Sequence, residues 1–445
     1  MARTLYQGRN WDLHGQPYED PITKGSLFMI ALGQSDNPLW SARYNGFSGD
    51  VNRFIVNANA GYALTKWLDL DYRAGLNQYT EGNLEWFRPG SRGAGGLGSV
   101  TDLTTNFREL ESTLLLTAKH RFNDSWALEG RVGHNLNERT GKTQGVSGTQ
   151  MLDFGIIDVD NTVSQVSAGG NYSQQRIFGV FGEVTADFKQ YVFLTLSGRN
   201  DWASTLPVKN NNYFYPSASV AFIFTEALKM INNPILNFGK LRMNWSKVGS
   251  PALPYSLKPI YLLNLGESDN LTAGIRDIDF PFAGIASSTL SNTLFDPDLK
   301  PEFTTDLEAG VDLEFLKSRV ELNFSIFKST SVDQISQLAL PTVSGFDQLL
   351  TNFGALQTKG TELSLRVNPV SSKSINWNIT ANFTRYRTIV TELRPGTEEL
   401  VIRPLFGGGI TPVLRVGQPY GIFRGTVSAR DEEGNLLIDR SNGQI

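Results

Sequence analysis

The chain has 445 residues and no cysteine, which excludes disulfide bonds and thiolate metal sites. Its net charge of -4, with no concentrated basic region, argues against a nucleic-acid-binding protein. Hydrophobic residues make up 40% of the chain, yet no run approaches the ~18 apolar residues of a membrane-spanning helix. A membrane protein with this sequence must therefore be a β-barrel, because only helices and closed barrels satisfy every backbone polar group in lipid.

The main signal along the chain is strict alternation of apolar and polar residues. Between residues 67 and 77, leucine, tyrosine and alanine occupy one face of a strand, and aspartate, arginine, glycine and asparagine occupy the other. Similar strands are predicted at 51–62, 109–122, 126–137, 176–188, 191–201, 213–225, 239–247, 302–315, 319–331, 360–369 and 375–388. Several match the ~9–11 residues with which a tilted strand crosses the hydrocarbon. One more strand is expected near 417–430.

The predicted connections alternate in length. Short turns are expected at 64–66, 123–125, 189–190, 316–318 and 370–374, and long segments at 78–108, 138–175, 248–301 and 332–359. A short helical turn fits within 225–236, on the rim with the short turns. Short turns on one rim and long loops on the other are typical of outer-membrane barrels. The sequence therefore predicts an all-β, antiparallel transmembrane barrel of roughly a dozen strands.

The clearest strand, 302–315, places five carboxylates on one face: Glu302, Asp306, Glu308, Asp312 and Glu314. Leu307, Val311 and Phe315 fall on the opposite face. Neighbouring acids at this spacing could flank a glycosidic bond. A row that faces water, however, lacks the apolar pocket that would separate the pKa values of an acid and a base. Lining of a polar lumen is the preferred interpretation, and no catalytic residue is predicted.

Three other patterns suggest chemistry less strongly than they suggest surface loops. Gly93–Gly98 fits a dinucleotide-binding pattern but has no helix behind it. Asp153, Asp158, Asp160 and Asn161 offer oxygen ligands, so calcium in this loop stays open, although the glycine and bidentate glutamate of an EF-hand are missing. His14, His120 and His134 have no metal-binding spacing. No cofactor and no metal site is otherwise predicted.

Aromatic residues recur near the predicted strand ends, where their amphipathic rings suit the membrane–water boundary. The alternative is that they are ordinary core residues. The set is Trp67, Phe122, Trp126, Phe188, Tyr191, Trp202, Tyr213, Tyr215, Phe315 and Trp377.

Several segments resemble the SusC/RagA branch of TonB-dependent outer-membrane transporters, typical of Bacteroidetes. These segments occur in the order of that family at 194–207, 213–217, 240–249, 299–305, 352–364 and 416–421, with looser matches at 37–40 and 51–54. The resemblance implies a plugged barrel of roughly 22 strands. We therefore expect residues 1–445 to be one barrel domain, the middle and later part of the family's barrel, with the plug and final strands outside it.

The resemblance also implies a function and its partners. It implies import of an oligosaccharide or peptide, a SusD-like surface lipoprotein above the barrel, a TonB complex that acts on the plug, and outer-membrane lipid around the wall. Candidate substrate contacts are Arg199, Asp201, Trp202, Tyr213 and Tyr215, although these residues could instead only shape a strand end. Two rival functions remain: a passive porin or adhesin-like barrel, and a soluble β-rich glycan-active enzyme.

Overall fold

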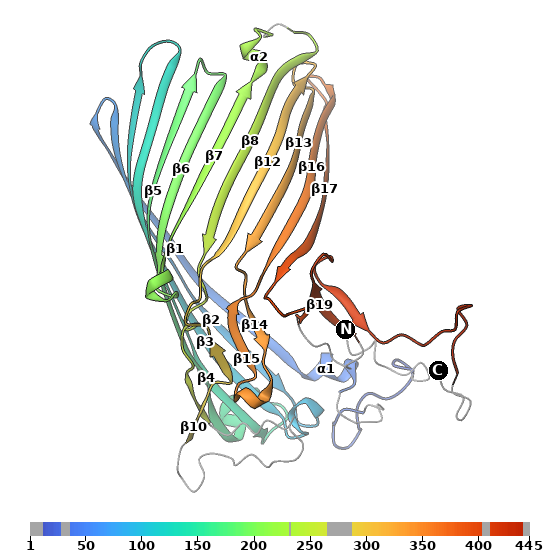
Figure 1. Cartoon of the computed structure of the whole chain (residues 1–445). Helices are drawn as coiled ribbons and strands as arrows, with labels where there is room; N and C mark the ends of the chain where they lie inside the picture. The colour runs from blue at the N-terminus through green and yellow to red at the C-terminus, as the bar shows by residue number, and fades with distance from the viewer. Residues whose placement is uncertain (1–11, 28–35, 231–232, 265–286, 403–409, 439–445) are drawn as a thin grey trace.

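The computed structural model describes residues 12–27, 36–230, 233–264, 287–402 and 410–438. Its main feature is one antiparallel sheet of twelve strands, which confirms the predicted fold class. In sheet order these strands are β1 (Gly46–Thr65), β2 (Leu68–Phe87), β3 (Ser99–Arg121), β4 (Trp126–Met151), β5 (Thr162–Phe188), β6 (Val192–Ala203), β7 (Asn212–Ile223), β8 (Leu236–Ser250), β12 (Glu302–Phe315), β13 (Val320–Val332), β16 (Gly354–Ser371) and β17 (Asn376–Leu393). The sheet curves like part of a cylinder wall, with β1 and β17 as its edges (Figure 1).

The register aligns the alternating side chains of all twelve strands into two chemically different faces. On the outer face, Ala309 of β12 lies between Met243 of β8 and Ile326 of β13. Met243 is 50% exposed and Ile326 is 51% exposed, so this face is an apolar surface rather than a protein core. We call this outward band of aliphatic and aromatic residues the apolar belt. Such a surface is stable when lipid covers it.

The height of the apolar belt matches a membrane. On the outer face of β4 it runs from Trp126 to Leu136, and the next outward residue is Glu138. The ten residue-to-residue steps from Trp126 to Leu136, at ~3.3 Å each, span about 33 Å along the strand. At the usual tilt of about 40° that becomes a band about 25 Å tall, the value for outer-membrane barrels.

The predicted long loops at 78–108 and 138–175 are wrong over most of their length. β2, β3, β4 and β5 continue through them, and only 88–98 and 152–161 are connections. These extensions carry polar residues on both faces, so the alternation that marks the membrane-spanning part disappears. Cross-strand hydroxyl pairs, Thr101 with Ser147 at 2.9 Å and Thr105 with Thr143 at 3.0 Å, lie along them.

The short-turn rim carries much of the expected aromatic girdle. Trp126 packs on Phe188 with 4.7 Å between ring centres, and Tyr191 continues the row to Phe222 at 6.4 Å. Trp67 and Trp377 are more than half exposed here. The tight turns need left-handed backbone, as at Lys189 and Gln190, with φ of 51° and 61°. The expected helical turn is α2 (Phe224–Ala227), at the top of Figure 1.

The opposite rim carries the longer connections and three small sheets. They are formed by β9 (Tyr261–Asn264) with β10 (Ser287–Leu290), by β11 (Thr293–Phe295) with β14 (Ile335–Ala339) and β15 (Gln348–Asn352), and by β18 (Glu399–Val401) with β19 (Ile410–Arg415) and β20 (Ile422–Gly425). Of the strand expected near 417–430, only the four residues of β20 form, and β20 pairs with β19 in a small sheet instead of extending the wall. Gly417 and Tyr420 still make backbone hydrogen bonds to Val390 and Thr388 of β17.

Helices are few in the described residues. The longest is α1 (Pro38–Tyr44), which begins at an Asn37 cap and buries Trp40. None of the described helices has the length and apolarity needed to cross a bilayer.

Candidate functional site

Arg199, Asp201 and Tyr215 form a hydrogen-bonded group on the inner face, near the long-loop ends of β6 and β7. The hairpin register sets Arg199 opposite Tyr215 and Asp201 opposite Tyr213. Arg199 Nε donates to Asp201 Oδ1 at 2.7 Å, and the Tyr215 hydroxyl donates to Asp201 Oδ2 at 2.6 Å. Asp201 is only 5% exposed, so both carboxylate oxygens are committed to internal partners. We interpret Asp201 as the residue that positions Arg199 and Tyr215.

Gly179 of β5 makes room for this group. It lies directly opposite Asp201, and a Cβ at this position would overlap the Asp201 carboxylate and the Arg199 guanidinium. The neighbouring Gly182 faces outward, where a Cβ would have only an ordinary contact of 3.7 Å to the Arg131 carbonyl.

We therefore expect Gly179→Ala to lower stability by about 1–3 kcal/mol through overpacking, while Gly182→Ala changes it little. Urea unfolding of the full-length protein in lipid vesicles measures both. Equal stability of the two variants would show that the Arg199–Asp201 pair moves aside freely.

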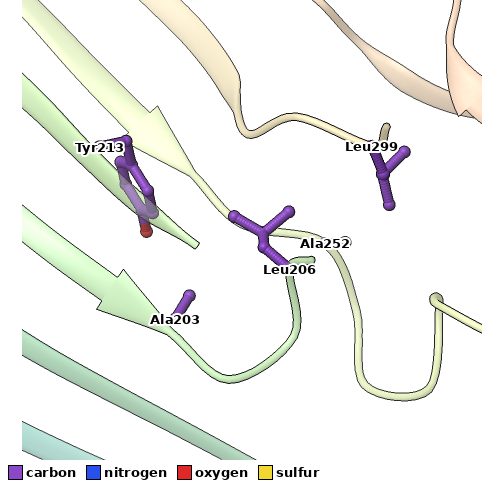
Figure 2. Close-up of a cluster of buried hydrophobic side chains, with 5 residues drawn as sticks. All are labelled: Ala203, Leu206, Tyr213, Ala252 and Leu299. Atoms are coloured by element: carbon purple, nitrogen blue, oxygen red, sulfur yellow. The ribbon is translucent and has the colours of Figure 1, made fainter. Parts of the chain in front are cut away.

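Tyr213 belongs to a buried cluster rather than to an open surface. It is 5% exposed and packs with Ala203, Leu206, Ala252 and Leu299 (Figure 2). Leu299 comes from the segment just before β12 and is fully buried, so a long loop folds over the inner face here. Asn210 holds that loop by donating from Nδ2 to the carbonyls of Asp298 and Leu299, at 3.0 and 3.1 Å.

Trp202 lies on the other face of the sheet from Arg199 and Asp201. It pairs with Phe178 of β5, and the two rings are 5.6 Å apart. The alternation of β6 makes this unavoidable, because Trp202 directly follows Asp201. Its position suits the long-loop edge of the apolar belt. The structure thus brings four of the five candidate residues together and separates Trp202 from them.

A cavity of about 350 Å³ opens beside the Arg199 group. Its inner-face walls include Phe181, Glu183, Ser197, Arg199, Tyr215 and Ser217. Arg199 lies over the Phe181 ring at 5.8 Å, and Glu183 pairs with Arg131 at 3.2 Å. The cavity therefore offers a cation, a carboxylate, hydroxyls and aromatic surface to a polar ligand. A role of these residues in substrate contact stays a prediction.

The predicted row of acids on β12 does face inward, but its members are largely occupied. Arg242 of β8 lies between Glu308 and Asp312, at 2.8 and 3.5 Å, and Lys240 also pairs with Asp312 at 2.8 Å. Glu302 accepts from the backbone N–H of Ile335 at 2.7 Å. Leu307, on the opposite face, is 42% exposed. Ion pairing with the neighbouring strand β8 therefore accounts for Glu308 and Asp312 of this row.

The sequence interpretation missed Asn352 as a structural residue. Its side chain accepts from Lys300 N at 2.9 Å and donates to the carbonyls of Lys300 and Asp333, at 3.0 and 2.7 Å. It thereby ties two long connections to each other. The only signal for it was its place in a segment shared with the resembled family.

The remaining motifs have structural roles in the described residues. Gly95, Gly96 and Gly98 adopt positive φ in a rim loop. Asp158 caps the short turn that follows it, and Asp153 accepts from Gly155 N at 2.6 Å. No group of three or more His, Asp or Glu side chains in the described ranges is arranged to hold a metal ion. Calcium binding by the loop around Asp153 stays an untested expectation.

A curved antiparallel sheet with an apolar belt outside and polar side chains inside is the wall of an outer-membrane barrel. The family model for the TonB dependent receptor-like β-barrel matches residues 3–412. The chain belongs to this family. As a TonB-dependent receptor barrel it is an outer-membrane protein, and its family consists of transporters and receptors rather than enzymes.

Relatives confirm the SusC/RagA resemblance of this TonB-dependent receptor barrel. TonB-dependent receptor P26 of Formosa agariphila is 30% identical over 260 residues, 57% of this chain and 24% of that protein. SusC of Bacteroides thetaiotaomicron is 25% identical over 289 residues, 61% of this chain and 28% of SusC. The structure of the RagAB peptide transporter has a TM-score of 0.71 at 19% identity, covering 88% of this chain and 42% of that one. The chain spans less than half the length of these relatives.

Proposed function

We propose that the complete protein imports a polar oligomer, an oligosaccharide or a peptide, across the outer membrane by TonB-dependent active transport. One observation carries this proposal: the sheet of this TonB-dependent receptor barrel has an apolar outer face and a predominantly polar inner face. The wall itself performs no covalent chemistry. Its tasks are to be compatible with lipid, to keep a wet interior and to position groups that bind substrate.

The cavity beside Arg199 supports a substrate rich in hydrogen-bonding groups. Arg199 lines the cavity, and its Nε is held by Asp201. A guanidinium held in this way loses little entropy when it binds a second acceptor. Such an acceptor is present in both candidate substrates, as a carboxylate or carbonyl of a peptide or as a uronate, sulfate or hydroxyl of an oligosaccharide.

The proposal includes two partners that the family resemblance suggests. A SusD-like surface lipoprotein would cover the barrel at the long-loop rim, and the TonB complex would supply energy through a plug. RagAB, the structural relative described above, is a peptide transporter. The RagAB likeness supports a peptide, and an oligosaccharide is the alternative that the SusC/RagA resemblance implies.

The test is uptake by cells whose chromosomal gene is replaced by full-length variants. Labelled oligosaccharide and labelled peptide mixtures are supplied separately, with and without TonB. We expect uptake of one class only, and none without TonB. Equal, TonB-independent entry of both classes would instead identify a passive porin.

Within the same assay we expect Arg199→Gln to raise the substrate concentration for half-maximal uptake by at least about tenfold, the loss of one charge-assisted hydrogen bond. Arg366→Gln is the matched control, because Arg366 is an inner-face arginine of β16 paired with Glu321 at 3.6 Å. Both variants are compared at equal surface levels. Similar uptake by the two variants would remove Arg199 from the substrate site.

A further inference from the structure

Five basic side chains gather on the outer face of the sheet, at the long-loop edge of the apolar belt. They are Lys247 of β8, Lys328 of β13, Lys359 of β16, and Arg385 and Arg387 of β17. The register makes Lys328 the direct partner of Lys359, and Lys359 the direct partner of Arg387. We call Lys328, Lys359 and Arg387 the basic row. With strands ~4.8 Å apart, three cations lie within about 10 Å across the strands.

The basic row lacks the compensation found elsewhere on this face. No ion pair links any of the five cations to a carboxylate in the described part of the chain. Glu362 of β16 is three residues from Lys359, but the register places it on the inner face. The next acids along the chain, Asp333 after β13 and Glu392 of β17, are five residues farther on, about 16 Å away. Like charges placed directly opposite each other destabilise a sheet.

Strands nearer the β1 edge of the sheet carry outward cations that an acid neutralises. On β3, β4 and β5, Glu138 lies between Arg108 and Arg176, at 3.4 and 2.5 Å. This trio also sits on the outer face, just beyond the apolar belt. The protein therefore pairs two of its outward cations there with an acid of its own. The basic row across β13, β16 and β17, three neighbouring strands in Figure 1, has no such acid.

The chemistry next to the basic row identifies its ligand. Ile326 lies two residues from Lys328 and is 51% exposed, and Phe383 lies two residues from Arg385 and is 54% exposed. A molecule that covers both surfaces must carry anionic groups and hydrocarbon about 7 Å apart along the strand. In an outer-membrane barrel the long-loop rim faces the cell exterior. The basic row is then at the level of the outer-leaflet headgroups.

We propose that the basic row is a binding site for the phosphate groups of an acylated lipid in the outer leaflet. The lysine ammonium groups and the Arg387 guanidinium bind the phosphate oxygens, while the acyl chains lie on Ile326 and Phe383. The bound phosphates replace the missing carboxylate and relieve the repulsion between the three cations. The proposal depends on the outer-membrane setting and is independent of which substrate is transported.

The experiment measures binding of fluorescently labelled, bis-phosphorylated lipid A to the full-length protein in detergent. We expect the double variant Lys328→Gln, Lys359→Gln to weaken binding about 25-fold, or about fivefold for each cation removed near an anionic surface. Lys328→Arg, Lys359→Arg keeps the charge and is expected to retain binding. The matched control is Arg108→Gln, Arg176→Gln, which removes two outward cations that share Glu138, with an expected change of at most about twofold.

Three results would overturn the proposal. One is equal binding of lipid A by the glutamine variant, the control and the unchanged protein. Another is equal binding of lipid A from which both phosphates have been removed. The third is displacement of the label by inorganic phosphate at the same concentration as unlabelled lipid A, which would make free phosphate the ligand. Thermal unfolding of each variant separates loss of charge from loss of fold, and the arginine variant provides the same check within the binding assay.

Discussion

Val132→Arg should prevent stable insertion of the barrel, whereas Asn135→Lys on the same strand should not. Val132 lies midway along the apolar belt on β4 and is 52% exposed on the outer face. A charged side chain at the bilayer midplane costs about 2–4 kcal/mol. Asn135 faces inward and donates to Glu111 at 3.0 Å, so a lysine there would meet a carboxylate.

The measurement is urea unfolding of the full-length protein in lipid vesicles, together with the amount of folded protein in the outer membrane. We expect Val132→Arg to lower the free energy of unfolding by about 2–4 kcal/mol. For Asn135→Lys we expect a free energy of unfolding within about 0.5 kcal/mol of that of the unchanged protein. If both variants fold equally well, lipid does not contact this part of β4. That result would remove the basis for reading the outer face as the membrane surface.

Asp201→Ala is expected to have the second large effect, because it leaves Arg199 and Tyr215 without their shared acceptor. Removal of one partner of a buried pair costs about 3–5 kcal/mol. The comparison is Glu183→Ala, which breaks the pair with Arg131 in a place where both side chains are more than a third exposed. An exposed ion pair contributes at most about 1 kcal/mol.

Because Asp201 is buried and Glu183 is not, we expect Asp201→Ala to lower stability clearly more than Glu183→Ala does. Unfolding in lipid vesicles gives the stability of each, and Asp201→Asn, which keeps one acceptor for Tyr215 or Arg199, should fall between them. A loss below about 1 kcal/mol for Asp201→Ala would mean that water reaches this group and that Asp201 does not position Arg199.

The two rims explain where sequence interpretation worked and where it did not. The short turns were predicted at nearly their observed places, because each lies between two segments with strong alternation. The extensions of β2 to β5 beyond the membrane were read as loops, since threonine, asparagine and glutamine on both faces leave no periodic signal. The strand expected near 417–430 forms only as the short β20, which pairs with β19 rather than with the wall, and no local pattern encodes that choice of partner.

The sequence alone also predicted some single residues of the candidate site and not others. Alternation by itself places Trp202 and Asp201 on opposite faces of the sheet, so the separation of Trp202 from the other candidates could be predicted from the sequence. The burial of Tyr213 was not, because it depends on Leu299, which packs on it from a segment more than 80 residues later. The hydrogen bond from Tyr215 to Asp201 was equally inaccessible, since it requires the β6–β7 register.

By itself, the sequence determined that the chain is a two-faced antiparallel wall of about a dozen strands, because a period of two is a local property of each strand. Only the tertiary structure decided which inward residues share a hydrogen bond, which are covered by loops, and which outward cations become neighbours. Most of those relations join residues on different strands, and a shift of the register by one residue would have changed which of them meet.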